Sequence, residues 1–282
     1  MAQSRQRRAG RGALPRLACY SPEVPGPVAP CRLCGNVREL VDSHVIPAWS
    51  YERAKRGPEG RQNNLVLLDG VNKSQVYAPR QISEHLLCRE CEDLLAVPEN
   101  YVSQLLFQDD GSFPLLERLP GGESDRVVPL PGDVDVESLA HFAYGVIWRG
   151  SVCSELKTKL GPYEQRFADY LLGRSGIPRR TSAIVKLISE PKLQRTLIPP
   201  QSERFQRCEK HYFLVCGAVF LIFVGGRIPS ALCAGHFPSE RVALVGTGDD
   251  VLSMAAPLFG HPAKGKLARD VARGTIGNRR SG

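Results

Sequence analysis

The sequence predicts an α+β protein: a small zinc-stabilised head, followed by helices and then an antiparallel sheet. Three observations predict this order. Two C-x-x-C pairs stand far apart near the N-terminal side, at Cys31/Cys34 and Cys88/Cys91. A long stretch with helical apolar spacing follows at 136–160. After Pro178 the apolar residues form short β-branched or aromatic runs, which are typical of strands.

The positive charge of the chain lies mainly in two tails. The 282 residues carry a net charge of +8 and are 42% hydrophobic, so the chain as a whole is globular. Residues 1–30 hold five Arg and one Glu, and residues 260–282 hold six Lys/Arg and one Asp, which leaves the centre nearly neutral. We expect both segments to be disordered basic tails. Such tails either contact phosphate backbones without reading sequence or only increase solubility.

The nine cysteines favour a reducing compartment. An odd number, with no apolar secretory segment at the N-terminus, argues against a disulfide framework. The longest apolar run, Tyr212 to Val224, is interrupted by Gly217 and is too short to span a bilayer. We therefore expect a soluble cytoplasmic protein with no membrane partner.

In the head, domain 31–118, we expect a strand over Glu39 to Ile46 that ends at Pro47. Residues 51–82 are polar with several Gly and Asn and are expected to form a long insertion with at most one hairpin. A helix is predicted from Ser83 to Leu95, with Ser83 as its N-cap, and another from Pro98 to Gln108.

Residues 119–135 are rich in Pro and Gly and are expected to be a linker or surface loop at a domain boundary. The second domain, 136–259, should begin with the amphipathic helix and a second helix that ends at Gly173. Its sheet should be antiparallel. The expected strands are Ser182–Ile188, Tyr212–Cys216, Val219–Val224 and Val242–Val245.

The two cysteine pairs predict a structural zinc site made of Cys31, Cys34, Cys88 and Cys91. A C-x-x-C turn lets two thiolates converge on one ion, and two such turns complete a tetrahedron. Gly35 suits the turn after the first pair. An ion held by four thiolates has no open coordination position, so this zinc would be structural and not catalytic.

Three segments of the head together resemble the zinc-containing HNH endonucleases: Cys31 to Gly35, Ser43 to Pro47 and Leu86 to Glu92. The resemblance implies a ββα, treble-clef-like core and hydrolysis of phosphodiester bonds in DNA. In that family a strand His is the general base, and a divalent cation, Mg²⁺ or another, stabilises the phosphate transition state. The segments Phe142–Arg149 and Leu160–Arg166 are similar to uncharacterised bacterial proteins with the same head.

Carried over residue by residue, the resemblance makes His44 the general base. Ser43 stands where active members often have a metal-binding residue, and Asp42 replaces it only if the strand is irregular, because neighbouring residues point to opposite faces. Glu92 matches the helix residue that holds the catalytic cation. His85 is a second candidate ligand. Asn63 and its neighbour Asn64 are the nearest matches to the Asn of the family's connecting loop.

Each of these residues also has a structural interpretation. His44 would then hydrogen-bond within its own turn, and His85 and Glu92 would be solvated helix residues. Trp148 is expected at the edge of the helical core, and Arg149 is expected to be exposed or paired with Glu155 or Glu164. Further downstream, a group of Cys and His is irregularly spaced and is interpreted as buried thiols and not as a second metal site. Its members are Cys208, His211, Cys216, Cys233 and His236.

The sequence therefore leaves three functions to compare. The first is a metal-dependent HNH-type endonuclease that acts on DNA. The second is a catalytically inactive zinc module that binds nucleic acid or protein, suggested by Ser43 and Glu92. The third is an interaction protein whose C-terminal domain does the work while the zinc head is a scaffold.

Overall fold

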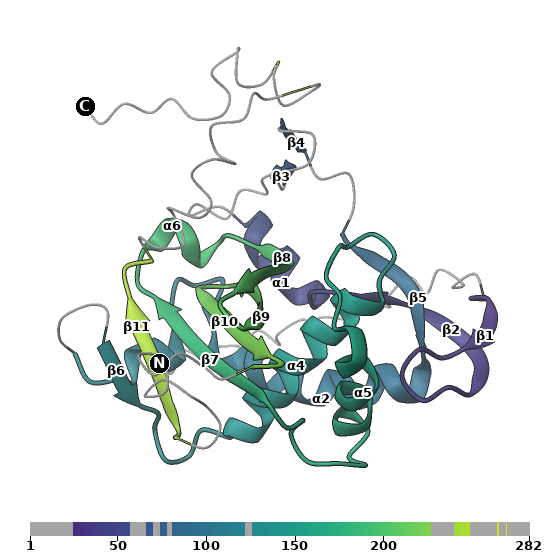
Figure 1. Cartoon of the computed structure of the whole chain (residues 1–282). Helices are drawn as coiled ribbons and strands as arrows, with labels where there is room; N and C mark the ends of the chain where they lie inside the picture. Colours follow the sequence, from purple (N-terminus) through teal and green to yellow (C-terminus); the bar gives the residue numbers. More distant parts are fainter. Residues whose placement is uncertain are drawn as a thin grey trace, which may run out of the picture.

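The computed structural model describes residues 25–56, 66–69, 74–77, 81–121, 126–226 and 240–248, together with positions 264 and 269. Within these ranges the protein is α+β (Figure 1). A small three-stranded sheet and a long helix form the N-terminal part. A six-stranded sheet forms the C-terminal part, and helices lie between the two.

The small sheet has the order β1-β2-β5 and is antiparallel. Its strands are β1 (Val28–Pro30), β2 (Val37–His44) and β5 (Ser83–Cys88). Strand β1 pairs with the start of β2, so regular structure begins three residues before Cys31, inside the segment expected to be a disordered tail. The rest of that tail, 1–24, and nearly all of 260–282 lie outside the described residues.

One predicted helix start was wrong. Ser83 is not an N-cap; it begins β5, because the backbone of Ser83–Cys88 pairs with β2. Helix α2 (Arg89–Leu105) begins directly after Cys88 and continues through Pro98. The two helices expected on either side of Pro98 are thus one helix, whose apolar side is buried at Leu95, Pro98 and Val102.

Between β2 and β5 the chain forms α1 (Ala48–Lys55), which the sequence did not predict, and one hairpin, as expected. The hairpin consists of β3 (Val66–Asp69) and β4 (Ser74–Tyr77). The remaining helical elements are α3 (Pro114–Glu117), α4 (Val136–Val152), a 3-10 turn (Gly161–Tyr163), α5 (Glu164–Leu171) and α6 (Pro191–Gln194). Gly173 follows α5 with φ +68°, which agrees with its predicted role at the end of that helix.

The large sheet has the order β6-β11-β7-β10-β9-β8. Its strands are β6 (Arg126–Pro129), β7 (Thr181–Ile188), β8 (Ile198–Phe205), β9 (Cys208–Val215), β10 (Ala218–Val224) and β11 (Val242–Gly246). Four predicted strands are confirmed. The expectation of a purely antiparallel sheet was wrong, because β11 returns beside β7 in parallel. Strands β6 and β8 were missed; both are edge strands, and edge strands tolerate the prolines that conceal them in the sequence.

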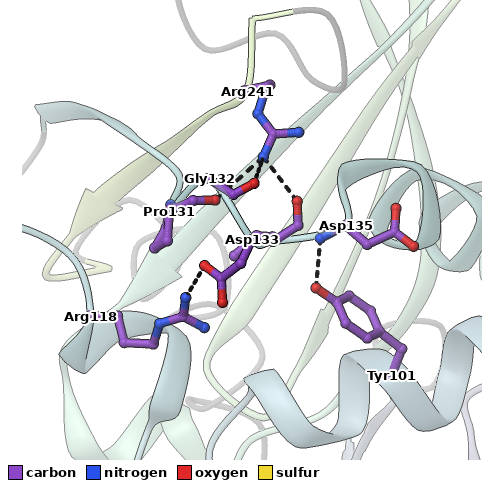
Figure 2. A network of polar contacts seen from close by, with 8 residues as sticks. Tyr101, Arg118, Pro131, Gly132, Asp133, Asp135 and Arg241 are labelled. Atoms are coloured by element: carbon purple, nitrogen blue, oxygen red, sulfur yellow. Dashed lines mark hydrogen bonds and ion pairs between the residues drawn. The ribbon is translucent and has the colours of Figure 1, made fainter.

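The segment expected to be a linker is part of the fold. Its strand β6 pairs with β11, and Figure 2 shows how the following turn is held. The Arg241 guanidinium donates to three carbonyl oxygens of this turn, those of Pro131, Gly132 and Val134, at 3.0–3.3 Å. On the other side, the Tyr101 hydroxyl accepts from the Asp135 amide at 2.6 Å. The turn therefore connects α2, α4 and the large sheet.

Helix α4 lies between α2 and the large sheet and is buried almost all round. Its Phe142 contacts two rings of the sheet edge to face, Phe213 and Phe220, which are stacked on each other with centroids 4.9 Å apart. Trp148 is fully buried, not at the edge of the core. One continuous set of buried side chains extends from Cys31 in the head to Val245 in the sheet.

No helix within the described ranges combines the length and apolar character that crossing a membrane requires.

Candidate metal centre and the cavities beside it

Four cysteine sulfurs come together where the small sheet meets α2. Cys31 and Cys34 lie in the turn between β1 and β2, Cys88 ends β5, and Cys91 lies in the first turn of α2. All four Sγ atoms are within 4.8 Å of one another, and those of Cys34 and Cys88 are 3.9 Å apart. A tetrahedral zinc with Zn–S bonds of ~2.3 Å has sulfurs about 3.8 Å apart. The four cysteines can therefore hold a metal ion.

Backbone hydrogen bonds hold the turns around these sulfurs in place. The Gly35 amide donates to the Cys31 carbonyl at 2.9 Å, and Gly35 adopts a φ of +80° that side chains disfavour. The Cys88 amide donates to the Cys31 sulfur at 3.3 Å. The amide of Arg32 donates to Leu86 at 2.9 Å, which ties the first turn to β5. The backbone thus fixes both cysteine pairs relative to each other.

Burial makes uncharged thiols the preferred form at part of this cluster. It raises the pKa of Cys88 to about 11 and raises that of Cys91 further. Burial also acts on Cys31, but hydrogen bonds from the backbone at Cys34, Cys88 and Leu33 outweigh it and lower the pKa of Cys31. A cation bound among the four sulfurs would supply the positive charge that favours the thiolate form of all four.

The pairing between β2, which carries His44, and β5 is irregular next to Asp42. The β2–β5 register shifts between Val41 and Asp42, and beyond the shift Asp42 pairs with His85 and His44 with Ser83. Since alternate residues share a face, Asp42 and His44 lie on one face and Ser43 on the other. Ser43 is fully buried, and its hydroxyl donates to the Val41 carbonyl at 3.3 Å. Asp42, and not Ser43, is therefore the side chain that shares the face of β2 with His44.

His44 opens onto a cavity of about 840 Å³. Its wall includes Asp42, His85, Glu84 and Glu155. Asp42 accepts a hydrogen bond from the Ser83 hydroxyl at 3.1 Å, which orients its carboxylate within the wall. Two imidazoles and three carboxylates thus surround one solvent-accessible space. Such a set of nitrogen and oxygen donors suits a divalent cation and repels anions unless a cation is bound.

Glu92 lies beside this cavity, in an adjoining one of about 420 Å³ that Asp42 and His85 also line. Asp42 and His85 therefore separate Glu92 from His44. The Oε2 atom of Glu92 is buried and has no hydrogen-bond partner among the described residues. A buried carboxylate oxygen without a partner is costly, so this atom is a candidate for binding a cation or water. His85 lies on a strand, and not on a helix as the structural interpretation supposed.

Arg149 contacts the backbone of His44, although the sequence analysis expected it to be exposed or paired with another acid. Its side chain is 1% exposed and forms an ion pair with Glu99 of α2, not with Glu155 or Glu164. It also donates to the His44 carbonyl oxygen at 2.8 Å. The sequence holds one hint of this, since Trp148-Arg149 lies inside a helical apolar pattern where an exposed cation would be out of place.

The structure does not describe all of the residues that the sequence singled out. Asn63 and Asn64 lie outside the described residues, as do Cys233 and His236. Cys208 and Cys216 are buried, in agreement with their interpretation as buried thiols. Within the described ranges, only the four cysteines place three or more possible ligand atoms within 4.8 Å of one another. Asp42, His44, His85 and Glu92 are neighbours, but they do not form a closed set of ligands.

Comparison with family models, with curated proteins and with solved structures found no match to this chain.

Proposed function

We propose that this protein is a metal-dependent endonuclease of the HNH type that hydrolyses phosphodiester bonds in DNA, with a structural zinc at Cys31, Cys34, Cys88 and Cys91. The observation that carries the proposal is the shared cavity of His44, Asp42 and His85. The order of elements also supports it. A cysteine turn, the antiparallel strands β2 and β5, and a helix that begins between the cysteines of the second pair occur in the order of a treble-clef ββα head, with α1 and the β3–β4 hairpin inserted between the two strands.

His44 would remove a proton from the attacking water. Neutral imidazole is an effective base near pH 7, and the side chain is half-buried at the edge of an open cavity, where water and a phosphate can reach it. The Tyr51 ring, 6.4 Å from the His44 ring between centroids, limits the directions in which the imidazole turns. The base is thus accessible and restrained.

Asp42, His85 and Glu92 would hold the divalent cation. Mg²⁺ in such sites keeps several waters and takes one or two carboxylates, so an open set of ligands is sufficient. The bound cation would stabilise the charge that develops on the phosphate. Asn63, the remaining predicted catalytic residue, stays a prediction, because the described residues do not include it.

The test is nicking of supercoiled plasmid in the presence of Mg²⁺ or Mn²⁺. We expect cleavage by the wild-type chain and a loss of at least about 100-fold in His44→Ala, the usual size of a general-base contribution. Glu92→Gln should also be impaired. Asp93→Asn is its matched control, because Asp93 is the next residue of the same helix turn, is exposed and lines neither cavity. Cleavage that survives in His44→Ala would remove His44 from the mechanism.

A second candidate function is a catalytically inactive zinc module that binds nucleic acid or protein. One observation favours it: among the described residues, no set of three ligand atoms is preassembled beside His44. In that case the wild-type chain would not cut DNA. Its binding would survive His44→Ala and be lost in Cys88→Ser, which removes a zinc ligand. Measuring DNA binding and cleavage on the wild type, His44→Ala and Cys88→Ser separates the two functions.

A further inference from the structure

The Arg149 side chain joins three separate elements at a single buried point. It comes from α4, forms an ion pair with Glu99 of α2 and donates to the carbonyl oxygen of His44 at the end of β2. Arg149 is 1% exposed and Glu99 is 14% exposed. Burial raises the pKa of Glu99, and the guanidinium of Arg149 opposes that change. These contacts lie on the side of His44 away from the solvent.

The His44 carbonyl needs this donor because the strand pairing does not supply one. The Val45 amide donates to the Ile82 carbonyl at 3.0 Å, so the pair after His44–Ser83 is hydrogen-bonded. Hydrogen-bonded and non-hydrogen-bonded pairs alternate along an antiparallel ladder. The His44–Ser83 pair is therefore of the second kind, and its carbonyl points away from β5. The Arg149 guanidinium therefore restrains the peptide plane that follows His44, and this restrains the Cα–Cβ bond from which the imidazole projects.

A buried ion pair of this kind is poorly explained by stability alone. Apolar residues of similar volume often replace such pairs without loss of stability, because removing two charges from water is costly. What an apolar pair cannot do is donate to a carbonyl. Lysine is also a poor substitute, since one ammonium lacks the planar fork that reaches a carboxylate and a carbonyl together. The arginine is thus suited to holding the end of β2 in a defined orientation.

We propose that Arg149, held by Glu99, is a positioning residue for His44: it sets the orientation of the imidazole in the cavity from behind. The inference rests on the proposed function for its catalytic meaning, but the orientation of His44 is measurable without any reaction. Helix α4 belongs to the helical layer and not to the zinc head. The head would therefore depend on the rest of the chain for the geometry of its histidine.

The experiment uses the full-length, zinc-loaded protein with ¹³C-labelled histidine and no added magnesium. The variant Arg149→Met/Glu99→Met removes both charges together, so neither is left unpaired. Arg204→Met/Glu209→Met is the matched control, because it removes an exposed ion pair of the β8–β9 hairpin. The His44 ring signal is assigned by its absence in His44→Ala. We expect that signal to move or broaden in the first double variant and to stay unchanged in the control.

Cleavage kinetics give the second readout. We expect kcat to fall by about 100-fold in Arg149→Met/Glu99→Met with little change in KM, as for a misplaced catalytic group. Arg149→Lys should lie between this variant and the wild type. An unmoved His44 signal in a folded, zinc-loaded double variant overturns the positioning role, whatever its activity. If the wild-type chain cuts no DNA, the proposed function fails, and the His44 signal alone decides the inference.

Discussion

Asp42 and His85 face each other across β2 and β5, directly beyond a shift in the register of the two strands. Asp42 and His85 separate His44 from Glu92, because they line both the cavity that His44 lines and the adjoining cavity that Glu92 lines. The alternation of residues along β2 places Asp42 on the same side of the strand as His44, while Ser43 is buried. Ser43, directly before His44, is not acidic. Asp42, two residues before His44, therefore supplies the acidic group on that side of the strand.

Asp42→Asn should therefore impair cleavage more than Ser43→Ala. The asparagine keeps the size of the side chain but removes the charge that faces His85, so a cation would bind more weakly. We expect at least about a tenfold loss at a fixed Mg²⁺ concentration, partly recovered at higher Mg²⁺, as for a loss of binding. Plasmid nicking over a Mg²⁺ series measures it. An equal effect of the two substitutions would show that Asp42 has no special role.

Metal removal should unfold the head first. Without a cation, the buried thiols of Cys88 and Cys91 take up protons, because burial raises the pKa of both. We expect bound zinc in the purified chain by elemental analysis, and its loss in Cys88→Ser together with a lower Tm. Cys208→Ser is the control, since Cys208 is also buried but lies in the large sheet. Equal zinc contents in these two variants would contradict the predicted ligand set.

The buried His211 should make the protein less stable in mild acid. Burial lowers the pKa of His211 to about 4, while its Nδ1 atom shares a 2.7 Å hydrogen bond with the Ser202 hydroxyl. The unfolded chain, with an ordinary histidine pKa near ~6.5, binds the proton more readily. Stability is therefore present above about pH 6.5 and is lost as the pH falls toward 4, by roughly 3 kcal/mol in total.

His211→Asn isolates this effect. Its unfolding free energy should fall less than that of the wild type between about pH 7 and pH 4.5, as measured by urea denaturation. His85→Asn is the control, because it also removes a histidine, but one that is exposed and lies in the small sheet. Parallel pH profiles for the wild type and His211→Asn would mean that His211 takes up its proton without unfolding.

The aromatic contact between α4 and the large sheet should be a main source of stability. Phe220 is fully buried, stacks on Phe213 and meets Phe142 edge to face. Phe220→Ala should cost about 3–5 kcal/mol, because it removes a ring and leaves a cavity. Val127→Ala, at a side chain that is 43% exposed on edge strand β6, should change stability by less than about 0.5 kcal/mol. Chemical denaturation of both variants checks the difference.

Local sequence patterns were sufficient to predict the elements in which apolar residues follow the spacing of a helix or form a short continuous strand run. The helical spacing of 136–152 and the apolar runs of β7, β9, β10 and β11 predicted those elements. Strands β6 and β8 escaped because prolines and charged residues are compatible with an edge strand but look like a loop in the sequence. Ser83–Cys88 was misread for a related reason, since the residues of β2 that pair with it lie 39 to 48 positions earlier in the chain.

The four cysteines remain the part of this protein that the sequence determined by itself. A C-x-x-C turn is a local structure, so each pair indicates two metal ligands in the sequence itself. Two such pairs together predict one four-cysteine metal site. Only the tertiary structure decided what surrounds that site. The pairing of β2 with β5 placed His85 opposite Asp42 and next to His44, and the fold brought Arg149 to the His44 carbonyl across 105 positions of sequence. Contacts at that separation depend on how strands pair and helices pack, which local residue patterns do not encode.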